Sequence, residues 1–252
     1  LFVFIWQATQ QLRLAIKVKN PRADVTTNRP ALENHGTRLS LSQVNQLFAY
    51  FEDKMDTLTG KRDLAILYLG ITSGLRAAEI ARLTLNNIRR GDDCWEIKVR
   101  GKRNNMDPIG IDNEAYDLIM QWVTAFNDGL SDDDPRRITG DIPLFQPLRR
   151  NGHRTTADSY DPKRPMIPRA ILFIVKKHTE AALEFSVGAH DMRRTCAYLM
   201  RNHGFEWEEI RTQLRHQSIA TTEKYVGKHL DLSRGLLSKR VHFTVPHAGG
   251  AA

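Results

Sequence analysis

Residues 64–80 read LAILYLGITSGLRAAEI, and this stretch decides how the rest of the chain is interpreted. Its first half is almost entirely apolar, which predicts a helix buried in a protein core. Ser73-Gly74 is typical of a helix end, and Arg76 then lies in the first turn of a new helix. A cation at a helix N-terminus opposes the helix dipole and needs compensation. A bound anion or the nearby carboxylate of Glu79 could supply it.

Helical patterns continue on both sides of this stretch. One helix begins after Ser40, a good N-cap residue, and the buried helix begins at about Lys61. Further helices are predicted near 76 and over 112–127, 168–183, 190–202, 206–214 and 219–228. Residues 94–100 alternate like a strand and 106–111 can return as a second, with a turn at 101–105 between them. The segment from Asp128 to Pro165 is rich in Asp, Pro, Arg and Gly and predicts surface loops. The predicted fold is mainly α with a small antiparallel β-sheet (α+β).

The composition is that of a globular protein with a basic charge balance. The chain has 252 residues, of which 37 are Lys or Arg and 29 are Asp or Glu, giving a formal charge of +8. Such a balance fits a polyanionic partner, since basic side chains displace the counterions condensed on phosphates. Its two cysteines, Cys94 and Cys196, are too few for a disulfide framework and predict buried, reduced thiols. The apolar run 1–6 is too short to span a bilayer, so no membrane association is expected.

Three further segments carry candidate chemistry, and each is weak evidence alone. His190 and Arg193 are spaced so that they share one face of a helix, yet such a pair is often only a solvated surface. Tyr225 follows His216 by nine positions on a short helix capped by Ser218, yet a lone tyrosine is usually a packed residue. Lys102 lies in the predicted hairpin turn, where lysines are ordinary.

Together, these segments resemble the tyrosine recombinase (phage integrase) family. The resemblance covers residues 37–230 and rests on four motifs in the family's order. These are TSGLRAAEI at 72–80, a strand–Gly101-Lys102–strand hairpin, HDMRRT at 190–195 and LRHQSIATTEKY at 214–225.

The resemblance implies a catalytic role for six residues. Tyr225 would attack a DNA phosphate and form a 3′-phosphotyrosine link, releasing a 5′-hydroxyl. Arg76 and Arg193 would bind the non-bridging oxygens, and His190 would assist proton transfer. Lys102 would protonate the departing oxygen, His216 would hydrogen-bond the phosphate, and Glu79 would orient the cations.

The same resemblance implies the wider organisation of the protein. Residues 1–36 would be the end of an N-terminal core-binding domain and its linker, 37–230 the catalytic domain, and 231–252 a C-terminal segment that docks on a neighbouring protomer or packs on its own domain. The partners would be double-stranded DNA and other copies of the chain in a homotetramer. No metal, ATP or other cofactor is expected, and the location would be the nucleoid region of the cytoplasm.

The sequence departs from the family pattern at two places. Arg215 stands where the family very often has glycine, which adds positive charge beside the site. The hairpin is less basic than is common, so Lys98 and Arg103 remain alternatives to Lys102. Besides recombination or integration, a topoisomerase- or resolvase-like activity and a non-catalytic DNA-binding role remain open.

Overall fold

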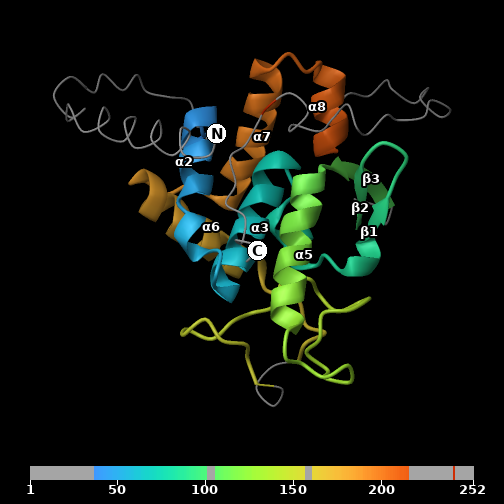
Figure 1. The fold of residues 1–252 in the computed structure, drawn as a ribbon. Helices are drawn as coiled ribbons and strands as arrows, with labels where there is room; N and C mark the ends of the chain where they lie inside the picture. The colour runs from blue at the N-terminus through green and yellow to red at the C-terminus, as the bar shows by residue number, and fades with distance from the viewer. Residues whose placement is uncertain (1–36, 101–105, 157–160, 216–240, 242–252) are drawn as a thin grey trace, which may run out of the picture. The chain divides into compact units, whose positions relative to one another are not determined.

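The computed structural model describes residues 37–100, 106–156, 161–215 and 241, all within one compact unit. Its central element is helix α3 (Leu58–Thr72), which packs against both α5 (Asn113–Asn127) and α7 (Ala189–Asn202) (Figure 1). Almost every residue of α3 is buried. The predicted core helix is therefore confirmed, beginning three residues earlier than expected.

The remaining helices surround this centre. They are α2 (Leu41–Ala49), α4 (Ala77–Ala81), α6 (Pro168–Leu183) and α8 (Trp207–Leu214), with the short 3-10 helices η2 (Glu52–Lys54) and η3 (Leu85–Asn87). Helix α6 packs against α2 and α4, and α8 packs against α7. The start of α2 follows from capping, because the Ser40 hydroxyl accepts a hydrogen bond from the Gln43 backbone N–H at 3.2 Å. The predicted helix over 219–228 lies outside the described residues.

A three-stranded antiparallel sheet lies beside α5, in the order β1-β2-β3 (Figure 1). Strands β2 (Trp95–Arg100) and β3 (Met106–Ile111) pair as the predicted hairpin, from Trp95 opposite Ile111 to Arg100 opposite Met106. Strand β1 (Ile88–Arg90) was not predicted, because three residues are too few to show an alternating pattern. Trp95 of β2 stacks on Tyr116 of α5 at a centroid distance of 3.6 Å, which ties the sheet to the helix.

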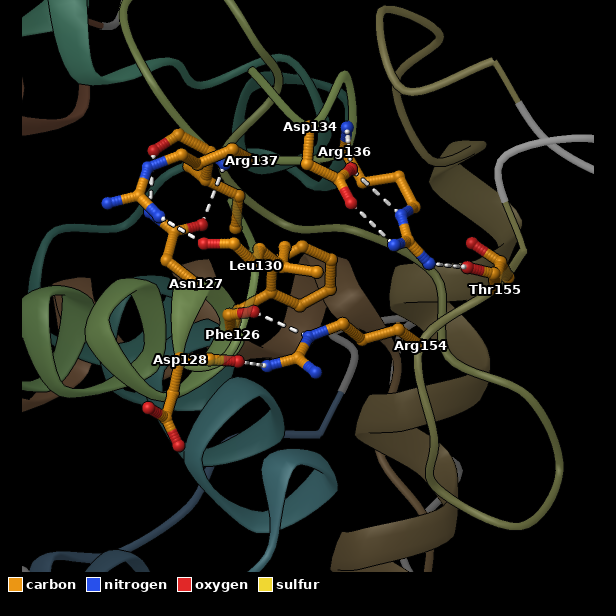
Figure 2. A network of polar contacts seen from close by, with 10 residues as sticks. Phe126, Asn127, Asp128, Leu130, Asp134, Arg136, Arg137, Arg154 and Thr155 are labelled. Carbon is orange, nitrogen blue, oxygen red and sulfur yellow. Dashed lines mark hydrogen bonds and ion pairs between the residues drawn. The ribbon is translucent and has the colours of Figure 1, made fainter. Parts of the chain in front are cut away.

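The long connection between α5 and α6 contains no helix or named strand among its described residues, in agreement with the predicted loops. Arginine side chains anchor it to the end of α5. Arg154 donates to the carbonyl oxygens of Phe126 and Asp128, both at 2.5 Å (Figure 2). The Asn127 side chain binds both backbone groups of Ile138, at 2.8 and 3.0 Å. These contacts satisfy carbonyl groups that a helix end leaves without intrahelical partners.

The predicted fold class, mainly α with a small antiparallel sheet, is confirmed. Cys94 and Cys196 are both buried free thiols, as expected. Of the helices that the structure describes, none is both long and apolar enough to cross a membrane.

Candidate active site

The first candidate residue, Arg76, is presented by a sharp turn between α3 and α4. Gly74 in this turn has a φ of +66°, a conformation that glycine adopts without steric cost. A Cβ atom at Gly74 would also lie 2.3 Å from Leu214 Cδ2 at the end of α8. Arg76 follows as the N-cap residue of α4, one position outside the predicted first turn, and its side chain is 47% exposed.

Glu79 holds Arg76 in two ways. Its Oε1 accepts from Arg76 Nη1 at 2.8 Å, and its Oε2 accepts from the Arg76 backbone N–H at 2.7 Å. This carboxylate compensates the cation at the N-terminus of α4, which is one of the two solutions that the sequence left open. Its side chain is largely buried, at 11% exposure.

A second arginine binds the same carboxylate. Arg215, the residue after α8, donates from Nη2 to Glu79 Oε2 at 2.7 Å. The Arg215 side chain is 8% exposed. Burial by itself would raise the pKa of Glu79, but the charges of Arg215 and Arg76 hold that pKa below its ordinary value. Glu79 is therefore an ionised group shared between two guanidiniums.

The predicted residue Arg193 projects from α7 and is almost fully buried. One terminal nitrogen donates to the Gly74 carbonyl oxygen at 2.6 Å, and the other donates to the carbonyl oxygen of Leu214. Its burial, followed by the nearby charges of Arg76 and Arg215, lowers the pKa of Arg193 to about 10, so the side chain stays protonated at neutral pH. An arginine has five N–H donors, so these two bonds leave donors for a further acceptor.

His190 lies in the first turn of α7 and is exposed at the surface. Partial desolvation, then the positive charges of Arg194 and Arg193, lower its pKa below the ordinary 6.5. Arg76 contributes in the same direction. The side chain is therefore neutral at neutral pH, the form that can accept a proton.

The structure thus brings together three of the six predicted catalytic residues and the predicted orienting carboxylate, from α4 and α7. With Arg215, which binds Glu79, these residues form one cluster in which positive charge dominates. Its members are Arg76, Glu79, His190, Arg193 and Arg215. The remaining N–H donors of Arg76 and Arg193 can bind an oxyanion, and phosphate is the common biological example. Lys102, His216 and Tyr225 lie outside the described residues, as does the alternative Arg103. Lys98, the other alternative, lies on β2 opposite Pro108.

Arg215 is the member of this cluster to which the sequence assigned no contact. It was noted only as a departure that adds positive charge. Its ion pair with Glu79 joins residues 136 positions apart, so no spacing rule could reveal it. The one feature of the sequence that pointed to Arg215 was the arginine itself, which stands next to the candidate residue His216 where the family very often has glycine.

Within the part of the chain that the structure describes, no group of three or more His, Cys, Asp or Glu side chains is arranged to hold a metal ion. The candidate site is built from guanidinium, imidazole and carboxylate groups.

Comparison with known proteins finds relatives that are tyrosine recombinases. Tyrosine recombinase XerD of Xanthomonas axonopodis pv. citri is 24% identical over 190 residues, covering 74% of this chain and 57% of that protein. Tyrosine recombinase XerC of Pelobacter propionicus is 27% identical over 173 residues, covering 68% of this chain and 49% of that protein. The chain thus spans about half the length of these curated relatives.

Solved structures show the same fold at low sequence identity. The integrase from mycobacterium phage Brujita has a TM-score of 0.56 and 18% identity, covering 97% of this chain and 70% of that one. The XerH site-specific recombinase bound to its difH substrate has a TM-score of 0.54 and 16% identity, covering 72% of this chain and 47% of that one. A family model described as the phage integrase family matches residues 37–230, more than half of the sequence. The chain therefore belongs to the phage integrase family.

Proposed function

We propose that this chain cleaves and rejoins DNA strands as a site-specific recombinase, with Tyr225 as the nucleophile. The observation that carries the proposal is that three predicted catalytic residues lie in one cluster: Arg76, Arg193 and His190. Arg76 comes from a segment far from helix α7, which carries the other two, and its charge helps to lower the pKa of His190 and of Arg193. Membership of the phage integrase family and relatives that are tyrosine recombinases support the same activity.

In this proposal, the Tyr225 hydroxyl attacks the phosphorus of a DNA phosphodiester. A bond from the tyrosine oxygen to phosphorus forms while the bond to the 5′-oxygen breaks. His190 assists removal of the tyrosine proton, and Lys102 gives a proton to the departing oxygen, which leaves as a hydroxyl. Arg76, Arg193 and His216 stabilise the charge on the phosphate oxygens in the transition state. Reversal with a second strand end rejoins the DNA without an external energy source.

We further propose double-stranded DNA and a homotetramer of this chain as the working assembly, in the nucleoid region of the cytoplasm. The charge of +8 supports a DNA partner, and the related XerH was solved bound to its difH substrate. In this scheme residues 1–36 end a core-binding domain, 37–230 form the catalytic domain, and 231–252 dock on a neighbouring protomer. Glu79 orients the cations of the site.

The test is covalent capture on nicked DNA. The protein is mixed with a pool of random-sequence duplexes that carry a 5′ label and a nick downstream of the randomised region. Cleavage near the nick releases a short fragment, so the labelled strand stays attached to the tyrosine and survives SDS. The expected result is an adduct with the wild-type chain and none with Tyr225→Phe.

Tyr116→Phe is the matched control, because the phenylalanine ring can keep the stack on Trp95. This variant should form the adduct as the wild type does. No adduct with the wild type, or an undiminished adduct with Tyr225→Phe, would contradict the proposal. Sequencing of the captured strands gives the preferred DNA site for all later measurements.

A further inference from the structure

Arg215 occupies its position at a conformational cost. It is the C-cap residue of α8, with φ 51° and ψ 47°, in the left-handed region that favours glycine. Only one other non-glycine residue in the described part of the chain has a positive φ, the exposed Glu184 at the end of α6. A glycine would suit the backbone at 215 better, so the reason for arginine lies in its side chain.

The Arg215 side chain also leaves a buried donor unsatisfied. Its Nη2 binds Glu79 Oε2, but its Nη1 is buried and has no hydrogen-bond partner. The other carboxylate oxygen, Glu79 Oε1, is taken by Arg76 Nη1 at 2.8 Å. Arg215 therefore makes a single-pronged contact, although a guanidinium and a carboxylate can form a two-pronged pair.

The two arginines that share Glu79 differ in their freedom to move. The Arg76 side chain is 47% exposed, whereas Arg215 is 8% exposed and Glu79 is 11% exposed. An exposed guanidinium can turn toward a DNA phosphate, but the buried pair must stay in place. When Arg76 turns, Glu79 Oε1 loses its partner, and a buried carboxylate oxygen without a donor is unfavourable.

We propose that Arg215 is a positioning residue that takes over Glu79 when Arg76 turns to the scissile phosphate, its free Nη1 replacing Arg76 on Oε1. The inference rests on the proposed DNA cleavage. The takeover keeps the carboxylate ionised and paired, so Glu79 does not hold Arg76 back from the phosphate. Arg215 thus acts through Glu79 and Arg76 and does not touch the DNA.

The experiment measures adduct formation by the full chain at saturating concentrations of the DNA captured with the wild type. Arg215→Gly should slow the adduct by about tenfold or more, while the DNA affinity falls less than the rate. Arg215→Lys keeps the charge but cannot form the two-pronged pair, so its rate should lie between those of the wild type and Arg215→Gly. Glu184→Gly is the matched control, because it relieves the same backbone conformation away from the site, and it should keep the wild-type rate.

A double variant separates positioning from direct contact. Arg215→Gly should slow adduct formation far less in a Glu79→Gln background than in the wild type, because no carboxylate is left for Arg215 to take over. If Arg215→Gly slows the adduct by the same factor in both backgrounds, Arg215 does not act through Glu79 and the inference is overturned. Wild-type rates in Arg215→Gly would overturn it as well.

A DNA-free measurement tests the contact itself. NMR titration of the Glu79 carboxyl should give a higher pKa in Arg215→Met than in the wild type. Burial raises this pKa and a methionine keeps much of the covering bulk, but it removes the charge of Arg215 that lowers the pKa most. An unchanged pKa would overturn the pairing on which the inference depends. If the wild type forms no adduct at all, the proposed function fails and the positioning role fails with it. If the wild type forms the adduct and Arg215→Gly forms it at the same rate, only the positioning role fails.

Discussion

Arg193 donates a hydrogen bond of 2.6 Å to the carbonyl oxygen of Gly74, a residue 119 positions earlier in the chain. Its second terminal nitrogen binds the carbonyl oxygen of Leu214. One buried guanidinium therefore connects the turn before α4, helix α7 and the end of α8. The same side chain that is proposed to bind the DNA phosphate also fixes the backbone that presents Arg76.

Arg193→Lys should impair both stability and activity. A lysine keeps the charge but cannot reach two carbonyl groups with a planar fork, so at least one buried acceptor loses its donor. We expect a loss of about 1–3 kcal/mol in the free energy of unfolding, measured by urea denaturation, and loss of the covalent adduct. Arg194→Lys is the control, since Arg194 is exposed and its described ion pair is a local one, with Asp191 at 2.6 Å. Equal stability of the two variants would contradict the connecting role.

Gly74→Ala should be more destabilising than the same change elsewhere in a left-handed turn. Alanine at a φ of +66° is strained, and its Cβ would lie 2.3 Å from Leu214 Cδ2. We expect a cost of about 2–4 kcal/mol from the conformation and the overlap together. Gly129 has a nearly equal φ of +70°, and beyond its chain neighbours no atom lies within 4 Å of the place a Cβ would take, so Gly129→Ala should cost only about 1 kcal/mol. If the two variants unfold at the same urea concentration, the close approach to Leu214 is not important.

His190 should titrate below the ordinary histidine pKa of 6.5. Because its folded pKa is lowered, the neutral form is favoured, and adduct formation should fall only as the pH drops below 6.5 and the imidazole takes up a proton. Arg194→Gln removes one of the positive charges and should raise the pKa of His190, measured by NMR. Arg137→Gln, in the loop after α5, should leave the His190 titration unchanged. A pKa of His190 that is the same in the wild type and Arg194→Gln would contradict the electrostatic cause.

Local chemistry made most of the fold predictable. The caps of α2 and α5, Ser40 and Asp112, lie within three residues of the backbone groups that they bind. The break at Gly74 is equally local, as is the pairing of Arg76 with Glu79. Motif resemblance placed Arg193 in the site, but it could not reveal that both its terminal nitrogens bind carbonyl groups. Contacts between distant segments, such as Arg215 with Glu79, depend on how helices pack and leave no spacing pattern in the sequence.

A buried polar cluster outside the site gives the last prediction. Asp63 on α3 binds Arg62 at 2.7 Å through one oxygen and His178 on α6 at 2.8 Å through the other. All three side chains are less than one-tenth exposed. Burial opposes ionisation of Asp63, but Arg62 and His178 together hold its pKa below the ordinary 3.8. The ionised carboxylate of Asp63 therefore joins α3 to α6 through His178.

Asp63→Asn leaves the buried Arg62 without its counter-charge, so the free energy of unfolding should fall by about 3–5 kcal/mol. Asp53→Asn removes a carboxylate from the exposed pair with Lys54, and it should leave stability within experimental error. The lowered pKa of Asp63 means that its contribution is present above pH 3.8 and is lost as the pH falls toward the folded value. Below pH 3.8 the stability of the wild type should therefore fall more steeply than that of Asp63→Asn, followed by thermal unfolding. Parallel curves for the two proteins would mean that folding does not lower the pKa of Asp63.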